Sequence, residues 1–156
     1  MSDIDSDLQN ALNLLRDAYI SKIPFNRELG LEIVTLDPHQ VCVRLDMQEK
    51  LVGNFIKKSL HGGVVASILD LTGGIIAGIG IARQLSGVSQ EVFFERIARM
   101  GTIDLRVDYL RPARGAYFLT GGSILRTGNK VAVARMEMQN DQGTLIAVGT
   151  GTYIVG

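Results

Sequence analysis

Cysteine, tryptophan and proline are scarce in this chain, whose 156 residues include one cysteine, no tryptophan and three prolines. A single cysteine excludes an intrachain disulfide and a metal site built from clustered cysteines. Cys42 lies between Val41 and Val43 in an apolar stretch. We therefore expect it to be buried as a small hydrophobic side chain.

An excess of charge of either sign is also missing, because 16 Lys and Arg residues balance 16 Asp and Glu residues. The sequence has no general basic surface for nucleic acid or an anionic membrane, and we expect neither partner. The chain begins MSDIDSD, which is acidic where a signal peptide would be basic and then apolar. Together with the single cysteine, this start predicts a cytoplasmic protein.

Hydrophobic residues are plentiful, at 46% against 21% charged residues, which excludes a disordered chain. The 18 glycines follow no triplet period, which excludes collagen. The length suits one domain, and no repeat, linker or low-complexity segment divides residues 1–156. We expect a single domain with a short N-terminal helix.

The first third of the chain changes from helical to strand periodicity. Asp5 or Ser6 can cap a helix that ends before Pro24 and whose apolar positions are Leu8, Leu12, Leu15 and Tyr19. Apolar and polar residues then alternate over 31–37 and 40–48, with turn residues between them. This pattern predicts a hairpin, with His39 exposed in its turn.

Strand periodicity returns in the second half, at 103–109, 116–126, 130–139 and 144–155. Short turn-rich connections between the last three runs suit antiparallel neighbours. A helix is expected near 89–99, with Val92, Phe93, Ile97 and Met100 facing inward. The order of elements predicts an α+β fold of about six antiparallel strands with one long apolar helix inserted early.

That long helix covers residues 62–82, in which Asp70 is the single charged residue. A transmembrane span is the first alternative, since Gly74 and Gly78 match the small-xxx-small pattern of membrane helix dimers. Asp70 would then lie near the bilayer centre at a cost of about 3 kcal/mol. Amphipathic strands also flank the segment, so we interpret it as the buried helix of a soluble protein.

A helical wheel separates small residues from bulky ones in this segment. The small residues lie within about 80° of Asp70 at about 100° per residue; they are Gly62, Gly63, Ala66, Ser67, Gly73, Gly74, Ala77, Gly78 and Gly80. Each glycine costs up to about 1 kcal/mol in a helix, so something must approach the backbone there. One interpretation is tight packing of a helix or sheet. The other is a ligand slot in which Asp70 acts as general base or nucleophile.

The helix begins at His61-Gly62-Gly63, where unpaired N–H groups and the positive end of the helix dipole favour an anion. Two glycines let a substrate carbonyl approach those donors without a Cβ in the way. The sequence therefore predicts an oxyanion hole here. A His at this position is equally compatible with a helix cap or a packing role.

With this motif, the sequence resembles the hotdog-fold acyl-CoA thioesterases of the phenylacetyl-CoA (PaaI-type) group. The resemblance is carried by HGGVVASILD, from His61 to Asp70, and by TIDLRVDYLRPA, from Thr102 to Ala113. It implies an antiparallel sheet wrapped around a central helix, with Asp70 as the catalytic carboxylate and the Gly62 N–H polarising the thioester carbonyl. Thr102 would orient the attacking water, and His61 would shape the loop and contact the substrate.

The chain departs from the family at one position in particular. The family commonly has an Asn six residues before the His, where this sequence has Phe55, with Asn54 one residue earlier. The segment 81–101 is also longer than in compact members. We expect Asn54, Gly63, Ser67 and Gly74 to contact the substrate.

The spacing of Gly62 and Asp70 has a consequence for assembly. Eight residues of helix separate their backbones by about 12 Å, whereas an oxyanion donor and an attacking group must both lie within about 3 to 3.5 Å of one carbonyl. We therefore expect the site to be shared between two chains. The family resemblance likewise implies a homodimer or a dimer of dimers.

Hydrolysis of an acyl-CoA is the function that these residues favour, without metal or cofactor, because no metal-ligand cluster or dinucleotide fingerprint is present. The alternatives are a hotdog dehydratase, for which no His/Glu acid–base pair is found, and a non-catalytic acyl-CoA-binding or sensing protein. Candidate contacts for CoA phosphates are Lys57, Lys58, Arg111, Arg114 and Lys130. The scarcity of aromatics beside many aliphatics favours a medium- or long-chain acyl group.

Overall fold

The computed structural model describes residues 3–85, 87 and 89–156. Its helical elements are α1 (Asp3–Asp17), η1 (Ala18–Lys22), α2 (Pro24–Leu29), η2 (Glu49–Leu51), α3 (Gly62–Gln84) and α4 (Gln90–Ala98). Its strands are β1 (Glu32–Leu36), β2 (Val41–Asp46), β3 (Val52–Asn54), β4 (Ser59–Leu60), β5 (Gly101–Tyr109), β6 (Tyr117–Thr127), β7 (Val131–Asn140) and β8 (Leu145–Ile154).

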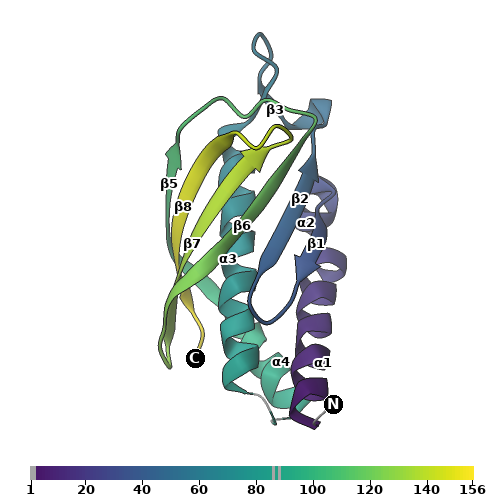
Figure 1. Ribbon diagram of the computed structural model, residues 1–156, viewed down its shortest axis with the longest axis vertical. Coiled ribbons are helices and arrows are strands. Elements are labelled where there is room, and N and C mark those ends of the chain that lie inside the picture. Colours follow the sequence, from purple (N-terminus) through teal and green to yellow (C-terminus); the bar gives the residue numbers. More distant parts are fainter. Residues whose placement is uncertain (1–2, 86, 88) are drawn as a thin grey trace.

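Six of the strands form one antiparallel sheet in the order β1-β2-β6-β7-β8-β5, and α3 lies along one face of it (Figure 1). This is the α+β hotdog arrangement that the sequence predicts, with six strands and a long central helix. The two-stranded pair β3-β4 was not anticipated. It leads the chain into the start of α3.

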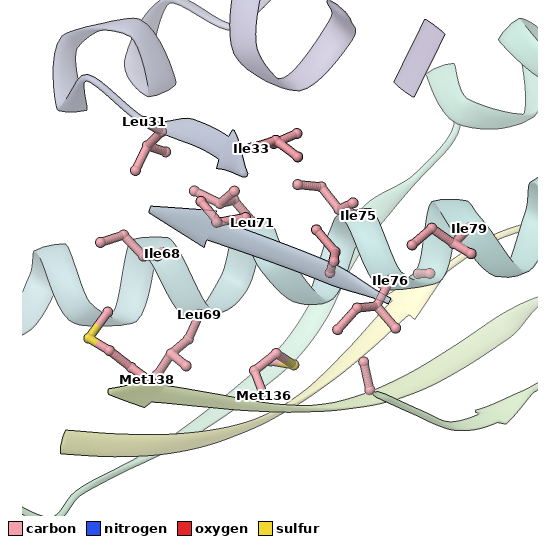
Figure 2. Packing of buried hydrophobic residues seen from close by; sticks show 14 of the residues in the cluster. Leu31, Ile33, Ile68, Leu69, Leu71, Ile75, Ile76, Ile79, Met136 and Met138 are labelled. Atoms are coloured by element: carbon pink, nitrogen blue, oxygen red, sulfur yellow. The ribbon is translucent and has the colours of Figure 1, made fainter. Parts of the chain in front are cut away.

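The bulky face of α3 forms the centre of the hydrophobic core. Leu71 and Ile75 point toward Leu31 and Ile33 (Figure 2). Leu69 and Ile76 point the other way, toward Met136 and Met138 of β7. Ile68, Leu69 and Ile75 are fully buried. Among the described residues α3 is the one helix long and apolar enough to cross a membrane, but its burial identifies it as a core helix.

The N-terminal helix packs as its periodicity predicts, since Leu12 and Leu15 are buried and α1 contacts α3. Pro24 ends that segment and also begins α2, where the first helical position tolerates its missing N–H. In α4, Phe93 is buried, but Val92 is 43% exposed, so the prediction that Val92 faces inward is wrong. Phe93, Ile97 and Met100 share the helical spacing that packs on the core, and Val92 lies outside that stripe.

Cys42 also differs from the expectation, because it is only partly buried. In β2 the alternating residues Val41, Val43 and Leu45 face the core, and Cys42 points to the opposite face of the sheet. His39 is exposed in the turn between β1 and β2, as predicted. The period of the strand, rather than the apolarity of the neighbours, decides where Cys42 points.

Strand β5 is the edge of the sheet and carries a β-bulge. Thr102 pairs with Tyr153 and Asp104 with the next residue, Thr152, so Ile103 is the extra residue in β5. A bulge moves the preceding residue to the other face of the strand. Thr102 consequently faces α3, while Ile103, the first apolar residue of the alternating run 103–109, is 54% exposed.

Candidate active site

The start of α3 is organised by His61. Its backbone N–H is held by the Leu51 carbonyl at 2.8 Å, and its Nδ1 accepts a 2.9 Å hydrogen bond from the Gly63 N–H. His61 is thus the N-cap, which is one of the two roles expected for it. Among the described residues, the Gly62 N–H has no hydrogen-bond partner, which leaves it available to an incoming oxygen.

Tyr109, at the end of β5, closes one side of this helix start. Its hydroxyl donates a 2.9 Å hydrogen bond to the Gly62 carbonyl. Beside it is a hollow of about 290 Å³ with a mostly apolar lining that includes Gly62, Val65, Tyr109, Leu110 and Ile146. The free N–H of Gly62 therefore borders a space that can admit an apolar group.

Asp70 lies two turns further along α3 and is half-buried. The Thr102 hydroxyl donates a 2.9 Å hydrogen bond to Asp70 Oδ1. This contact exists because the bulge turns Thr102 toward the helix. A hydroxyl that donates to the carboxylate keeps its own oxygen free to accept a hydrogen bond from a water molecule, so the pair can hold a water beside Asp70.

Tyr153, which is buried, and Tyr19, which is partly buried, lie behind Asp70. The Tyr153 hydroxyl, from β8, donates a 3.0 Å hydrogen bond to the Asp70 carbonyl. Burial, and next the negative charge of Asp70, raises the pKa of Tyr153. The same two causes raise the pKa of Tyr19, from η1, to about 12. Both hydroxyls therefore remain neutral beside the carboxylate at ordinary pH.

These tyrosines correct the prediction of a ligand slot along the whole small-residue face of α3. A Cβ on Gly73 would clash with the Tyr153 hydroxyl, and one on Gly74 would lie 2.6 Å from the Tyr19 hydroxyl. A Cβ on Gly78 would meet Leu15 at 2.7 Å. Gly74 is thus covered by Tyr19 rather than open to substrate, and the tight-packing interpretation holds for the middle of this face.

The remaining predicted contact residues are engaged in local structure. The Ser67 hydroxyl donates to the Gly63 carbonyl at 2.7 Å. Asn54 Oδ1 accepts a 2.8 Å hydrogen bond from the Lys57 N–H and so stabilises the turn between β3 and β4. Gly63 is exposed next to the His61 ring.

The structure therefore gathers the predicted residues into two groups within one chain. His61, Gly62 and Gly63 lie at the start of α3, and Asp70 with Thr102 lies about 12 Å along it at the ordinary helical rise. Tyr19, Tyr109 and Tyr153 were not predicted from the sequence as residues of the site. Of these, Tyr109 could have been found from its place at the end of an alternating strand. Among the described residues no three His, Cys, Asp or Glu side chains are grouped to hold a metal ion.

The fold and the two groups of residues on α3 agree with the similarity of this chain to known proteins. The model of the Thioesterase superfamily matches residues 57–147. The chain belongs to the thioesterase superfamily. It is accordingly a thioester hydrolase, and the matched segment contains Gly62, Asp70, Thr102 and Tyr109 but neither Tyr19 nor Tyr153.

Relatives within the thioesterase superfamily match almost the whole chain. The medium/long-chain acyl-CoA thioesterase YigI of Escherichia coli (strain K12) is 43% identical over 95% of this chain and 96% of its own length. The protein of the same name from Salmonella typhimurium is equally similar. A crystal structure from Shewanella oneidensis, described as related to the thioesterase superfamily, has a TM-score of 0.92 and 44% identity, covering 96% of this chain and 97% of that one.

Proposed function

We propose that this protein hydrolyses medium- to long-chain acyl-CoA thioesters at a site assembled from two copies of the chain. The observation that carries the proposal is the hydrogen bond from Thr102 to Asp70, which presents a carboxylate and a hydroxyl together at a solvent-accessible position. The names of relatives at 43% identity support the substrate class. A reducing compartment, the cytoplasm, suits a chain whose only cysteine has no partner thiol.

The edge strand β5 supports the shared site. Within the described residues its neighbour in the sheet is β8 alone, so its outer edge is free to pair with another strand. Thr102 at its start contacts Asp70, and Tyr109 at its end contacts Gly62. Antiparallel pairing of two β5 strands would set the Thr102 end of one beside the Tyr109 end of the other. Asp70 would then lie near the Gly62 N–H of the partner, which a single helix does not allow.

The proposed chemistry uses both groups on one carbonyl. The Gly62 N–H of one chain binds the thioester oxygen and stabilises the negative charge that develops there. The carboxylate from the other chain takes a proton from water as the water oxygen bonds to the carbonyl carbon, or attacks that carbon directly to give an anhydride that water then hydrolyses. The C–S bond breaks in either route, and CoA leaves as the thiolate, which is then protonated.

The loop before α3 supports recognition of an acyl-CoA. Phe55 and Ile56 are 81% and 79% exposed, and Lys57 and Lys58 follow them directly. An acyl-CoA has an apolar chain and a set of phosphates, which match an apolar pair and two cations respectively. The loop joins β3 to β4 and so lies close in sequence to His61 and the oxyanion donor.

Release of free thiol from acyl-CoAs of increasing chain length tests the proposal. Wild type is compared with Asp70→Asn and with Asp7→Asn, the same change at an exposed position of α1. We expect turnover of medium and long chains by wild type and Asp7→Asn, with a loss of at least about 100-fold in Asp70→Asn. Unchanged turnover in Asp70→Asn would exclude the assigned role. Binding of acyl-CoA without turnover by wild type would indicate a non-catalytic binding protein instead.

A further inference from the structure

A second hollow lies at the opposite end of α3 from Gly62, where the sheet divides. Strands β2 and β6 pair only between Asp46 and Tyr117 at one end and Cys42 and Gly121 at the other. Strand β6 continues to Thr127 with β7 as its neighbour, while β1 and β2 turn away (Figure 1). The gap so formed opens a hollow of about 450 Å³ onto the core helix.

This β2–β6 hollow has an apolar interior and a basic rim. Ile76 and Ile79 of α3, with Val41 and Ile124, supply its apolar surface. Arg83 and His39 lie at its rim, and no Asp or Glu is among its lining residues. A volume of this size falls within the range of small-molecule sites, roughly 300 to 1,000 Å³.

Arg83 is available to a ligand. It is exposed in the last turn of α3 and, within the described part of the chain, makes no hydrogen bond or ion pair. The nearest acidic residue in sequence to the rim, Asp37, is occupied by its own turn, where it accepts hydrogen bonds from His39 N–H, Gln40 N–H and the Gln40 side chain. The positive charge at the rim is therefore not cancelled by a lining carboxylate.

We propose that the β2–β6 hollow binds an aliphatic carboxylate of medium chain length, with its chain over Ile76 and Ile79 and its carboxylate on Arg83. A guanidinium binds a carboxylate through two parallel hydrogen bonds, and the apolar interior requires an apolar tail. One arginine is too few cations for the phosphates of CoA. This is also the chemical class of the product in the proposed reaction, so the biological relevance of the site rests on that proposed function.

The β2–β6 hollow is separate from the candidate active site. Arg83 lies 13 residues after Asp70 in α3, a distance of about 20 Å along the helix. In the sheet, β6, β7 and β8 separate β2 from the edge strand β5 that carries Thr102. A carboxylate bound at Arg83 would therefore lie about 20 Å along the helix from the position of Asp70.

The test is direct binding of decanoate by titration calorimetry, with amide chemical shifts to locate it. Arg83→Gln removes the charge, and Gly80→Leu places a side chain among the lining residues. Arg99→Gln is the control for loss of an exposed arginine, and Asp70→Asn is the control for the active site. We expect saturable binding to wild type, at least about tenfold weaker binding to Arg83→Gln, and no binding to Gly80→Leu. Arg99→Gln and Asp70→Asn should bind as wild type does.

Shifts should cluster at Ile76, Ile79 and residues 122–127, and decanol should bind more weakly than decanoate. The proposal is overturned if wild type does not bind saturably, if Arg83→Gln binds like wild type, or if the shifts cluster at Gly62 and Asp70. Should Gly80→Leu fail to fold, Arg83→Gln and the shift map decide. Decanoate binding reports on the β2–β6 hollow, and thiol release reports on the proposed hydrolysis, so failure of one proposal is distinguished from failure of the other. Asp70→Asn should reduce only thiol release.

Discussion

Thr102 Oγ1 donates a 2.9 Å hydrogen bond to Asp70 Oδ1, joining the edge strand β5 to the central helix across 32 positions of sequence. The contact depends on the bulge at Ile103, which brings Thr102 to the helix side of the strand. Removing the hydroxyl therefore tests the role of this pair without disturbing the core.

Thr102→Val keeps the shape and the strand preference of threonine but removes the donor. We expect kcat to fall about 10- to 100-fold, because a hydrogen bond to a charged group contributes about 1.5 to 3 kcal/mol. Thr102→Ser, which keeps the hydroxyl, should retain most of the activity. Equal activities for Thr102→Val and wild type, with both folded by circular dichroism, would contradict the role given to this hydroxyl.

Gly62→Pro removes the N–H that we assign to the oxyanion while keeping a residue suited to the first helical position. We expect kcat to fall about 10²- to 10³-fold, the usual loss for one oxyanion donor. Gly62→Ala is the matched control, since its N–H is kept and its Cβ would contact Tyr109 at an ordinary 3.5 Å. If the two variants lose activity to the same extent, the loss comes from bulk and not from the donor.

Gly73 and Gly80 lie on the same face of α3 but should respond differently to alanine. In Gly73→Ala the Cβ would meet the Tyr153 hydroxyl, and we expect unfolding free energy to fall by about 1 to 3 kcal/mol. In Gly80→Ala it would lie 3.3 Å from the movable Thr127 hydroxyl, so the change should be neutral or stabilising by up to about 1 kcal/mol. Urea denaturation measures both, and a stable Gly73→Ala would mean that Tyr153 is not held where we describe it.

Tyr19 should make the free energy of unfolding fall at alkaline pH. Its folded pKa, raised mainly by burial and also by Asp70, is about 12 against an ordinary value of 10.0. The folded state therefore holds the phenol proton more tightly, and the stability from this group is complete below pH 10 and is lost between pH 10 and about 12. We expect unfolding free energy to fall less steeply over this window in Tyr19→Phe than in wild type. Parallel curves for the two proteins would contradict the burial of this hydroxyl.

Most helices and strands, and the site residues on α3, could be predicted from the sequence because they follow local patterns. The stripe of small residues around Asp70 and the His61-Gly62-Gly63 start are visible within one helix. The partners of that stripe are not visible, since Tyr19 and Tyr153 reach Gly74 and Gly73 from segments far away in the chain. The bulge at Ile103 likewise left no signal, because residues 103–109 alternate as a regular strand would.

The central claim is that the Gly62 donor and the Asp70 carboxylate of one active site belong to different chains. It is tested most directly by dissociating Asp70→Asn and Gly62→Pro proteins, mixing them in equal amounts and reassociating them, with differently tagged chains to measure heterodimers. Each mixed dimer would contain one intact site and half of the dimers would be mixed, so we predict recovery to about a quarter of wild-type activity from two inactive parents. Verified heterodimers with no recovered thiol release would contradict the shared site.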